Sequence, residues 1–195
     1  MKRALKVLTA SAFLIPALAL SAAEPDANSE PAVKTGLKVG QQAPEFKIKD
    51  AGGKLIDLAD LTAKGPVLVR LTCGCSGCDK ELGYFQALHE AYKGKGLTSL
   101  AVFKEPDARV ESYVKEKKLQ MLYAVDTDGK SWSVFETKTM PTNFLIDKGG
   151  TIRAIAAGCD PSGLVAQNLS EKVAKLVGAA TSDVQGEAKS NGNGK

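Results

Sequence analysis

The 195-residue sequence is poor in the side chains that many catalytic and binding sites use. It has one histidine and one tryptophan, and aromatic residues make up only 6% of the chain. It has neither a glycine-rich phosphate loop nor a dinucleotide fingerprint, and no stripe of basic residues that would bind nucleic acid. We therefore expect no nucleotide cofactor and no nucleic-acid partner. Because no histidine directly follows Cys78, the chain also lacks the motif for covalent haem attachment.

The chain also lacks an apolar run of about 20 residues, the length that a membrane-spanning helix prefers. A basic N-terminus precedes the apolar residues 7–20, and three small residues, Ser21-Ala22-Ala23, follow them. This order is typical of a secretory signal peptide. We predict that residues 1–23 are a signal peptide cleaved at its end, and that the protein is periplasmic or otherwise extracytoplasmic. An uncleaved membrane anchor is the alternative.

Neither sign of charge dominates the rest of the chain. The first 23 residues hold three of the 26 basic residues and none of the 22 acidic ones, so the remainder is close to neutral. Residues 24–36 and 179–195 offer little to bury, and we predict a disordered linker and a disordered tail. Residues 37–178 are long enough to form one domain with a hydrophobic core.

Within residues 37–178, strand-like and helix-like segments alternate. The clearest strand is 67–72, a near-continuous apolar run of the kind that is buried on both faces of a sheet. Apolar residues at helical spacing follow Cys78 and predict a helix. Further strands are expected at 97–103, 121–125, 143–147 and 151–157, and further helices at 107–118 and 162–177. This order predicts an α/β fold with a mixed sheet.

Four cysteines supply most of the chain's possible chemistry. Cys73, Cys75 and Cys78 lie between the predicted strand 67–72 and the helix that follows, and Cys159 comes after the last predicted strand. A Cys-x-x-Cys pair at a helix start has its first sulfur near the positive end of the helix dipole, which stabilises a thiolate. The spacing therefore predicts a redox pair in which Cys75 is the nucleophile.

Three motifs, in order along the chain, give it a family resemblance. They are Val39-Gly40-Gln41-Gln42-Ala43-Pro44-Glu45-Phe46, the apolar strand leading into Cys75-Ser76-Gly77-Cys78, and Met140-Pro141-Thr142-Asn143-Phe144-Leu145-Ile146-Asp147. With them the chain resembles the thioredoxin-like redoxins, and within these the TlpA/ResA-type extracytoplasmic thiol–disulfide oxidoreductases. The resemblance implies a thioredoxin-like sandwich, in which helices flank a central mixed β-sheet, with an N-terminal β-hairpin extension.

The same resemblance implies a role for each matching residue. Cys75 is expected to attack a disulfide and Cys78 to resolve the mixed disulfide, while Met140 and a cis Pro141 bind an extended substrate peptide. Glu81 matches the acid of the family's Cys-x-x-Cys-x-x-Glu pattern. Its spacing also puts it on the apolar face of the helix, where a carboxyl group can exchange a proton with the thiols. The alternative is an ordinary first-turn acid that the helix dipole favours.

The expected roles of Arg70 and Cys159 depend on their positions in such a fold. Arg70 lies about where thioredoxins have a buried acid, and a cation there either helps to hold Cys75 as a thiolate or extends to solvent. Cys159 is expected at the sheet edge that carries the cysteine pair. Because cysteines of exported proteins usually pair, we expect a structural or regulatory Cys73–Cys159 disulfide beside the Cys75–Cys78 pair.

Two other classes of protein remain as alternatives. The first is a thioredoxin-like metal-binding module for copper or zinc, whose thiolate ligands would be Cys73, Cys75, Cys78 and Cys159. The lone histidine, His89, is expected to pack in its helix and not to bind metal. The second is a peroxiredoxin-type peroxidase, because Thr72 and Cys75 match a Thr-x-x-Cys motif. Leu68, however, stands where that motif has proline.

The sequence thus predicts an exported thiol–disulfide oxidoreductase that uses no cofactor and reduces selected protein disulfides. Its expected partners are disulfide-containing protein clients and a membrane-embedded thiol donor that restores the dithiol. We expect the protein to act as a monomer.

Overall fold

The computed structural model of the chain describes residues 35–190. The predicted signal peptide, 1–23, lies outside the described residues, as does all of the predicted linker except Thr35 and Gly36. None of the helices within 35–190 has the length and apolar character needed to cross a membrane.

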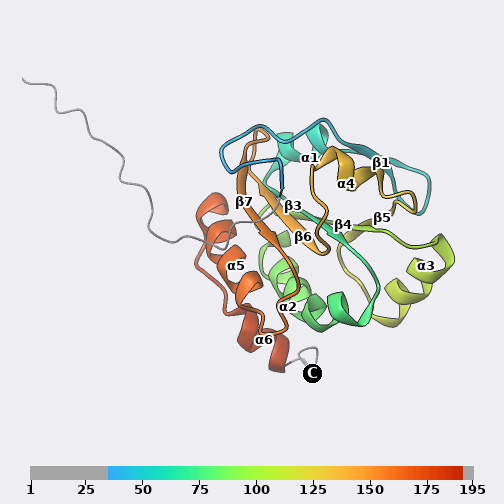
Figure 1. Cartoon of the computed structure of the whole chain (residues 1–195). Helices are drawn as coiled ribbons and strands as arrows, with labels where there is room; N and C mark the ends of the chain where they lie inside the picture. Colours follow the sequence, from blue (N-terminus) through green and yellow to red (C-terminus); the bar gives the residue numbers. More distant parts are fainter. Residues whose placement is uncertain (1–34, 191–195) are drawn as a thin grey trace, which may run out of the picture. The chain divides into compact units, whose positions relative to one another are not determined.

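A five-stranded sheet forms the centre of the fold, with the strand order β5-β4-β3-β6-β7 (Figure 1). Its strands are β3 (Val67–Thr72), β4 (Thr98–Phe103), β5 (Leu122–Val125), β6 (Thr142–Ile146) and β7 (Ile152–Ala157). Strands β3, β4 and β5 run parallel, whereas β6 and β7 pair antiparallel, so the sheet is mixed as expected. Every residue of the central strand β3 is buried, which explains its near-continuous apolar sequence.

Four helices pack on one face of this sheet. They are α2 (Ser76–Lys93), α3 (Asp107–Glu116), α5 (Leu164–Val177) and α6 (Val184–Ser190), and Figure 1 shows α2, α5 and α6 together below the sheet. Because side chains alternate along a strand, Leu68 of β3 faces these helices and packs in one cluster with Phe85 of α2 and Leu169 of α5. Arg70, two residues after Leu68, points to the same face.

The opposite face is covered by the N-terminal part of the described chain and by one short helix. Strands β1 (Lys47–Lys49) and β2 (Leu55–Asp57) form an antiparallel hairpin, which confirms the predicted N-terminal extension. Helices α1 (Leu58–Lys64) and α4 (Lys130–Val134) complete this layer. The core there contains Val67, Val69 and Leu71 of β3, packed with Phe46, Ile56, Leu58, Trp132, Phe135 and Phe144.

The C-terminal segment corrects one expectation. Residues 179–195 were predicted to be a disordered tail, but α6 forms within them and buries Val184 and Ala188 against α2 and α5. The backbone N–H of Ser182 donates to Tyr92 Oη at 2.9 Å, and that of Val184 donates to Gln167 Oε1 at 3.0 Å. Two small apolar residues one turn apart are enough to dock this helix, and they are too few to give a visible periodic pattern.

The strand registers bring three distant segments to one edge of the sheet. Leu71 of β3 is paired with Thr142 of β6, and Thr142 is paired with Ala157 of β7. The pairing extends one residue beyond both strands, because the N–H of Gly158, just after β7, donates to the carbonyl of Pro141, just before β6, at 2.8 Å. The cysteines that follow β3, Pro141 before β6 and Cys159 after β7 therefore share this edge.

Candidate active site

The first element of the site is the loop that joins β3 to α2. Cys73 directly follows β3, and Cys75 is the N-cap residue of α2, with an extended backbone at φ −81° and ψ 158°. Its side chain makes no capping hydrogen bond, and the N-cap position puts its sulfur beside the unpaired N–H groups of the first turn. Cys75 is half-buried, whereas Cys73 and Cys78 are only 8% and 4% exposed.

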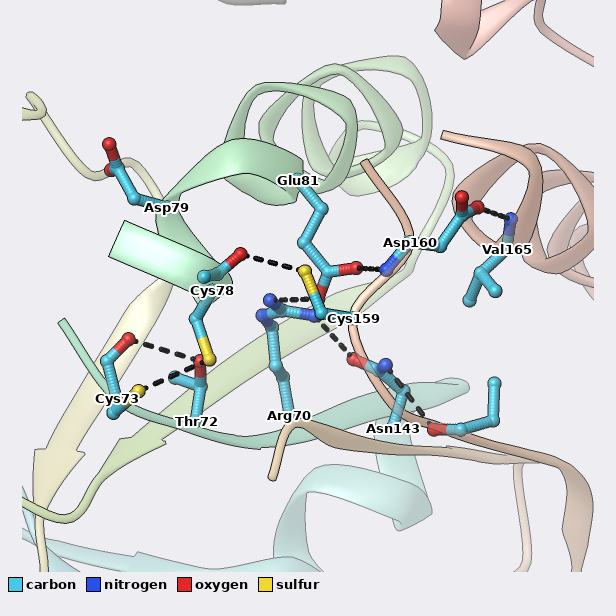
Figure 2. Close-up of polar contacts among 12 residues, drawn as sticks. Arg70, Thr72, Cys73, Cys78, Asp79, Glu81, Asn143, Cys159, Asp160 and Val165 are labelled. Atoms are coloured by element: carbon cyan, nitrogen blue, oxygen red, sulfur yellow. Dashed lines mark hydrogen bonds and ion pairs between the residues drawn. The ribbon is translucent and has the colours of Figure 1, made fainter. Parts of the chain in front are cut away.

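Three sulfur atoms lie together at this loop. Cys73 and Cys75 are joined by a disulfide. Cys78 Sγ lies 3.2 Å from Cys73 Sγ (Figure 2). All three Sγ atoms lie within 4.8 Å of one another. Cys75 and Cys78 are therefore close, but Cys75 is bonded to Cys73, and Cys78 is a free, buried thiol.

Cys159 lies on the other side of the first turn of α2, which corrects the expected Cys73–Cys159 disulfide. Its thiol is free and donates a hydrogen bond to the carbonyl oxygen of Gly77 at 2.7 Å (Figure 2). Cys73 instead points toward Cys75 and Cys78, so two cysteines at the same sheet edge face different partners. Cys159 is exposed, but its pKa is raised above the ordinary value, first by partial desolvation of the sulfur and then by electrostatic repulsion from Glu81 and Cys78.

A buried ion pair lies beneath the cysteines. Arg70 Nη2 lies 2.5 Å from Glu81 Oε1, and Nη1 donates to Asn143 Oδ1 at 3.0 Å (Figure 2). The guanidinium also stacks 4.1 Å from the centre of the Phe85 ring. Both interpretations of Arg70 from the sequence are therefore incomplete. It is buried and does not extend to solvent, and its cation is paired with Glu81, not with Cys75.

Glu81 also connects α2 to the loop that carries Cys159. Its second carboxylate oxygen accepts the backbone N–H of Asp160 at 2.8 Å. Asp160 in turn orders the start of α5, where its carboxylate accepts the N–H groups of Ser162 at 2.9 Å and Val165 at 2.7 Å. Burial acts to raise the pKa of Asp160, but these hydrogen bonds outweigh it and the pKa is lowered.

Residues near α3 hold the cysteine loop from its other side. Both carboxylate oxygens of Glu105, which is 9% exposed, accept the N–H of Gly74, at 2.9 and 2.8 Å. The ring of Tyr113 packs against Gly74, and its hydroxyl donates to Asp79 Oδ1 at 3.0 Å. Burial and the Asp79 carboxylate raise the pKa of Tyr113. Lys117 completes the group by pairing with Asp79 Oδ2 at 2.9 Å.

Sequence reasoning did not find Asn143, Glu105, Tyr113 or Asp160. The one signal available was Asn143, a polar residue inside the apolar run of β6 that has no exposed surface in the fold. A buried amide needs hydrogen-bond partners, so its presence in a central strand indicates a buried polar group on a neighbouring strand. Here that group is Arg70, which is paired with Asn143 across β3 and β6.

Met140 and Pro141 stand at the start of β6. The peptide bond between them is cis, Pro141 is buried, and Met140 is half-buried against the core of the β1–β2 face. Since Leu71 pairs with Thr142, the register puts Pro141 next to Thr72, one residue before Cys73. His89, by contrast, is 8% exposed within α2, and burial lowers its pKa. It is not among the ligand groups that lie together at the cysteine loop.

The cysteines lie at the N-terminus of a helix, directly after the central strand of a mixed sheet, and a cis-proline lies beside them. This arrangement defines a thioredoxin-like protein. The family model for the AhpC/TSA family matches residues 39–155, and the chain belongs to this family. It is 35% identical over 120 residues to the thiol-disulfide oxidoreductase ResA of Bacillus cereus, which covers 61% of this chain and 69% of that protein.

Two further comparisons agree with this class. The chain is 30% identical over 126 residues to ResA of Bacillus subtilis, covering 64% of this chain and 70% of the relative. The solution structure of a thiol:disulfide interchange protein from a Bacteroides species superposes with a TM-score of 0.61 at 28% identity, over 74% of this chain and 93% of that one. The protein is a thiol–disulfide oxidoreductase of the ResA type.

Proposed function

We propose that the protein is an exported reductant of selected protein disulfides, with Cys75 as the attacking thiolate and Cys78 as the resolving thiol. The observation that carries this proposal is the difference in their surroundings. Cys75 is half-buried at the N-cap of α2, where an attacking sulfur has access to substrate, and Cys78 is 4% exposed one turn further on. The helix N-terminus favours the thiolate of Cys75, and the thiolate is the form that attacks a disulfide.

The reaction begins from the reduced cysteines. The Cys75 thiolate attacks one sulfur of a client disulfide, forms a mixed disulfide and releases the other client sulfur as a thiolate that takes up a proton. Cys78, once deprotonated, then attacks Cys75 Sγ. This step forms the Cys75–Cys78 disulfide and releases the second client thiol. Two electrons have passed from the protein to the client, and a membrane-embedded thiol donor restores the dithiol.

Cys73 gives this site a second thiol that can bond to Cys75. The two are joined in the structure, and Cys78 Sγ lies 3.2 Å from Cys73 Sγ. We assign the resolving step to Cys78 because Cys75 and Cys78 form the Cys-x-x-Cys motif. In this scheme the Cys73–Cys75 bond is an oxidised form that must be opened before Cys75 can attack.

The remaining predicted residues act around this pair. Met140 and Pro141 lie at the same sheet edge as the cysteines and are proposed to contact the backbone of an extended client segment, in the manner of strand addition. Glu81 was expected to exchange protons with the thiols. We now propose that it acts by position, because both of its oxygens are engaged, one by Arg70 and one by the N–H of Asp160.

Reduction of insulin or of a model peptide disulfide tests the assignment. Cys75→Ser should abolish turnover, whereas Cys78→Ser should stop after one attack and accumulate the mixed disulfide with the client. Cys159→Ser is the matched control and should keep wild-type turnover. Full activity of Cys75→Ser would overturn the assignment of the nucleophile. If Cys73→Ser accumulates the mixed disulfide and Cys78→Ser does not, Cys73 is the resolving thiol.

Export is tested separately. Fractionation of cells that produce the full chain should give a mature form, shortened by the residues 1–23, outside the cytoplasm. Retention of the full-length chain in the membrane would show an uncleaved anchor. A cytoplasmic full-length chain would contradict export.

A further inference from the structure

The cysteine loop holds one more thiol than disulfide exchange requires, and the three sulfurs have the arrangement of a metal site. We propose that the reduced protein binds one Cu(I) ion through the thiolates of Cys73, Cys75 and Cys78. The inference rests on the proposed function in one respect, because these cysteines must pass through a reduced state. It adds a ligand that competes with the disulfide.

The separations of the sulfur atoms fit such a site. The three Sγ atoms lie within 4.8 Å of one another, and Cys78 Sγ lies 3.2 Å from Cys73 Sγ. A metal ion bound to three thiolates at about 2.3 Å, the distance found for zinc and sulfur, needs sulfur separations of roughly 4 Å. Because Cys73 and Cys75 are bonded in the structure, their sulfurs must be reduced and move apart to reach this separation.

Contacts around the cysteine loop hold the three proposed ligands close together. The carboxylate of Glu105 accepts the N–H of Gly74 with both oxygens, between two of the proposed ligands. The third ligand, Cys78, stands in the first turn of α2 and is fixed by the helix. Two of the three sulfurs belong to buried residues, so water has little access to the metal.

The number of ligands favours Cu(I) over zinc. Thiolates bind both metals, but structural zinc takes four ligands in a closed tetrahedron, and this cluster offers three. Within residues 35–190, the clustered group contains three cysteines and neither a histidine nor a carboxylate. The acids nearest the loop are engaged, Glu81 with Arg70, Glu105 with Gly74 and Asp79 with Lys117. Cys159, the fourth ligand expected from the sequence, lies apart from the cluster, on the carbonyl of Gly77.

Cu(I) binding and the Cys73–Cys75 disulfide exclude each other. Three thiolates carry three negative charges, which Cu(I) and the positive end of α2 partly compensate. A Cys73–Cys75 disulfide removes two of the three ligands, so the oxidised protein cannot form the site. Cu(I) in turn occupies Cys75 and blocks its attack on a client. Binding also releases protons from thiols that were protonated.

An anaerobic competition titration tests the proposal directly. The full mature chain, reduced with a phosphine that is then removed, is titrated with Cu(I) held by a chromophoric chelator. We expect one Cu(I) per protein, and at least a tenfold loss of affinity in each of Cys73→Ser, Cys75→Ser and Cys78→Ser. Cys159→Ser is the matched control and should bind as the wild type does. Circular dichroism checks that each variant is folded.

Three results would overturn the site. Wild-type affinity in Cys73→Ser would leave an ordinary two-thiolate pair, and a tenfold loss in Cys159→Ser would indicate the four-cysteine site. Tighter binding of zinc than of Cu(I), relative to a reference dithiol peptide, would reject the metal assignment. Because chemical reduction replaces the physiological donor, the titration does not depend on client reduction. Loss of insulin reduction with intact Cu(I) binding would contradict the proposed function and leave this site standing.

Discussion

The guanidinium of Arg70 lies 2.5 Å from the carboxylate of Glu81, and both side chains are only 2% exposed. This pair joins the central strand β3 to helix α2 directly below the cysteine loop. Each partner has one further hydrogen bond, from Arg70 to Asn143 and from the N–H of Asp160 to Glu81. Burying two charges is costly, and it is tolerated where the partners and their hydrogen bonds are all supplied. The pair therefore fixes the platform from which the thiols react.

Breaking this pair should destabilise the protein strongly. Arg70→Met leaves the Glu81 carboxylate buried without a cation, and we expect a loss of about 3–5 kcal/mol in the free energy of unfolding. The double variant Arg70→Met/Glu81→Leu removes both charges and should recover much of that loss. Urea unfolding of the three proteins measures the difference.

The control for this experiment is an exposed pair. Arg153 lies 2.6 Å from Asp147, but its side chain is 49% exposed, so Arg153→Met should cost less than about 1 kcal/mol. Equal small losses in Arg70→Met and Arg153→Met would show that the buried charges are not coupled as described.

Much of the fold followed from hydrophobic pattern alone. The strand predicted at 67–72 coincides with β3, and the helix predicted at 107–118 overlaps α3, which ends at Glu116. Helices α1 and α4 were missed because, at seven and five residues, they are too short to show a helical period. Helix α6 was missed for the same reason, since it docks through only two buried residues.

The site was predictable where one motif holds the residues and unpredictable where contacts cross elements. Cys75 at a helix start and Pro141 beside a strand are local features of the sequence. The Arg70–Glu81 pair and the contact of Glu105 with Gly74 depend on which faces of different elements meet. The partner of Cys73 was equally out of reach, because four cysteines allow three pairings and sequence does not choose among them.

The loop that carries Cys159 depends on Gly163, which has a φ of 81°. A Cβ at this position would lie 2.6 Å from Cδ1 of Tyr84, in addition to the cost of a left-handed backbone for a residue with a side chain. We expect Gly163→Ala to lower the free energy of unfolding by at least about 1–2 kcal/mol. Thermal unfolding measures the change.

Gly94→Ala provides the comparison for Gly163→Ala. Gly94 has a φ of −72°, and a Cβ there meets nothing within 4 Å. Its replacement should change stability by no more than about 0.5 kcal/mol. If Gly163→Ala is as well tolerated as Gly94→Ala, the close packing of this loop against Tyr84 is wrong.

Helix α6 should contribute to stability although it lies near the chain end. A chain that stops after Ala180 loses the burial of Val184, which is fully buried, and of Ala188. We expect it to be less stable by about 2–3 kcal/mol, the usual gain from burying a side chain of this size. A chain that stops after Ser190 keeps α6 and serves as the control. Equal urea midpoints for the two chains would show that the predicted disordered tail was the better description.

The reactivity of Cys159 should show an unusual dependence on pH. Partial desolvation of its sulfur and electrostatic repulsion from Glu81 and Cys78 raise its pKa, so less of it is thiolate at neutral pH than in an unfolded chain. Because the thiolate is the reactive form, alkylation of Cys159 should be slower than in the denatured protein near pH 8 and should approach that rate only at higher pH. Peptide mapping by mass spectrometry, after short exposure to iodoacetamide at a series of pH values, measures the Cys159 rate separately.

The exposed Lys80 provides a variant that leaves the buried pair intact. Its positive charge lowers the pKa of Cys159, so Lys80→Gln should raise that pKa further and move the alkylation profile to higher pH. A move to lower pH would contradict this sign. A wild-type profile that matches the denatured chain would show that neither burial nor the Glu81 charge acts on this thiol.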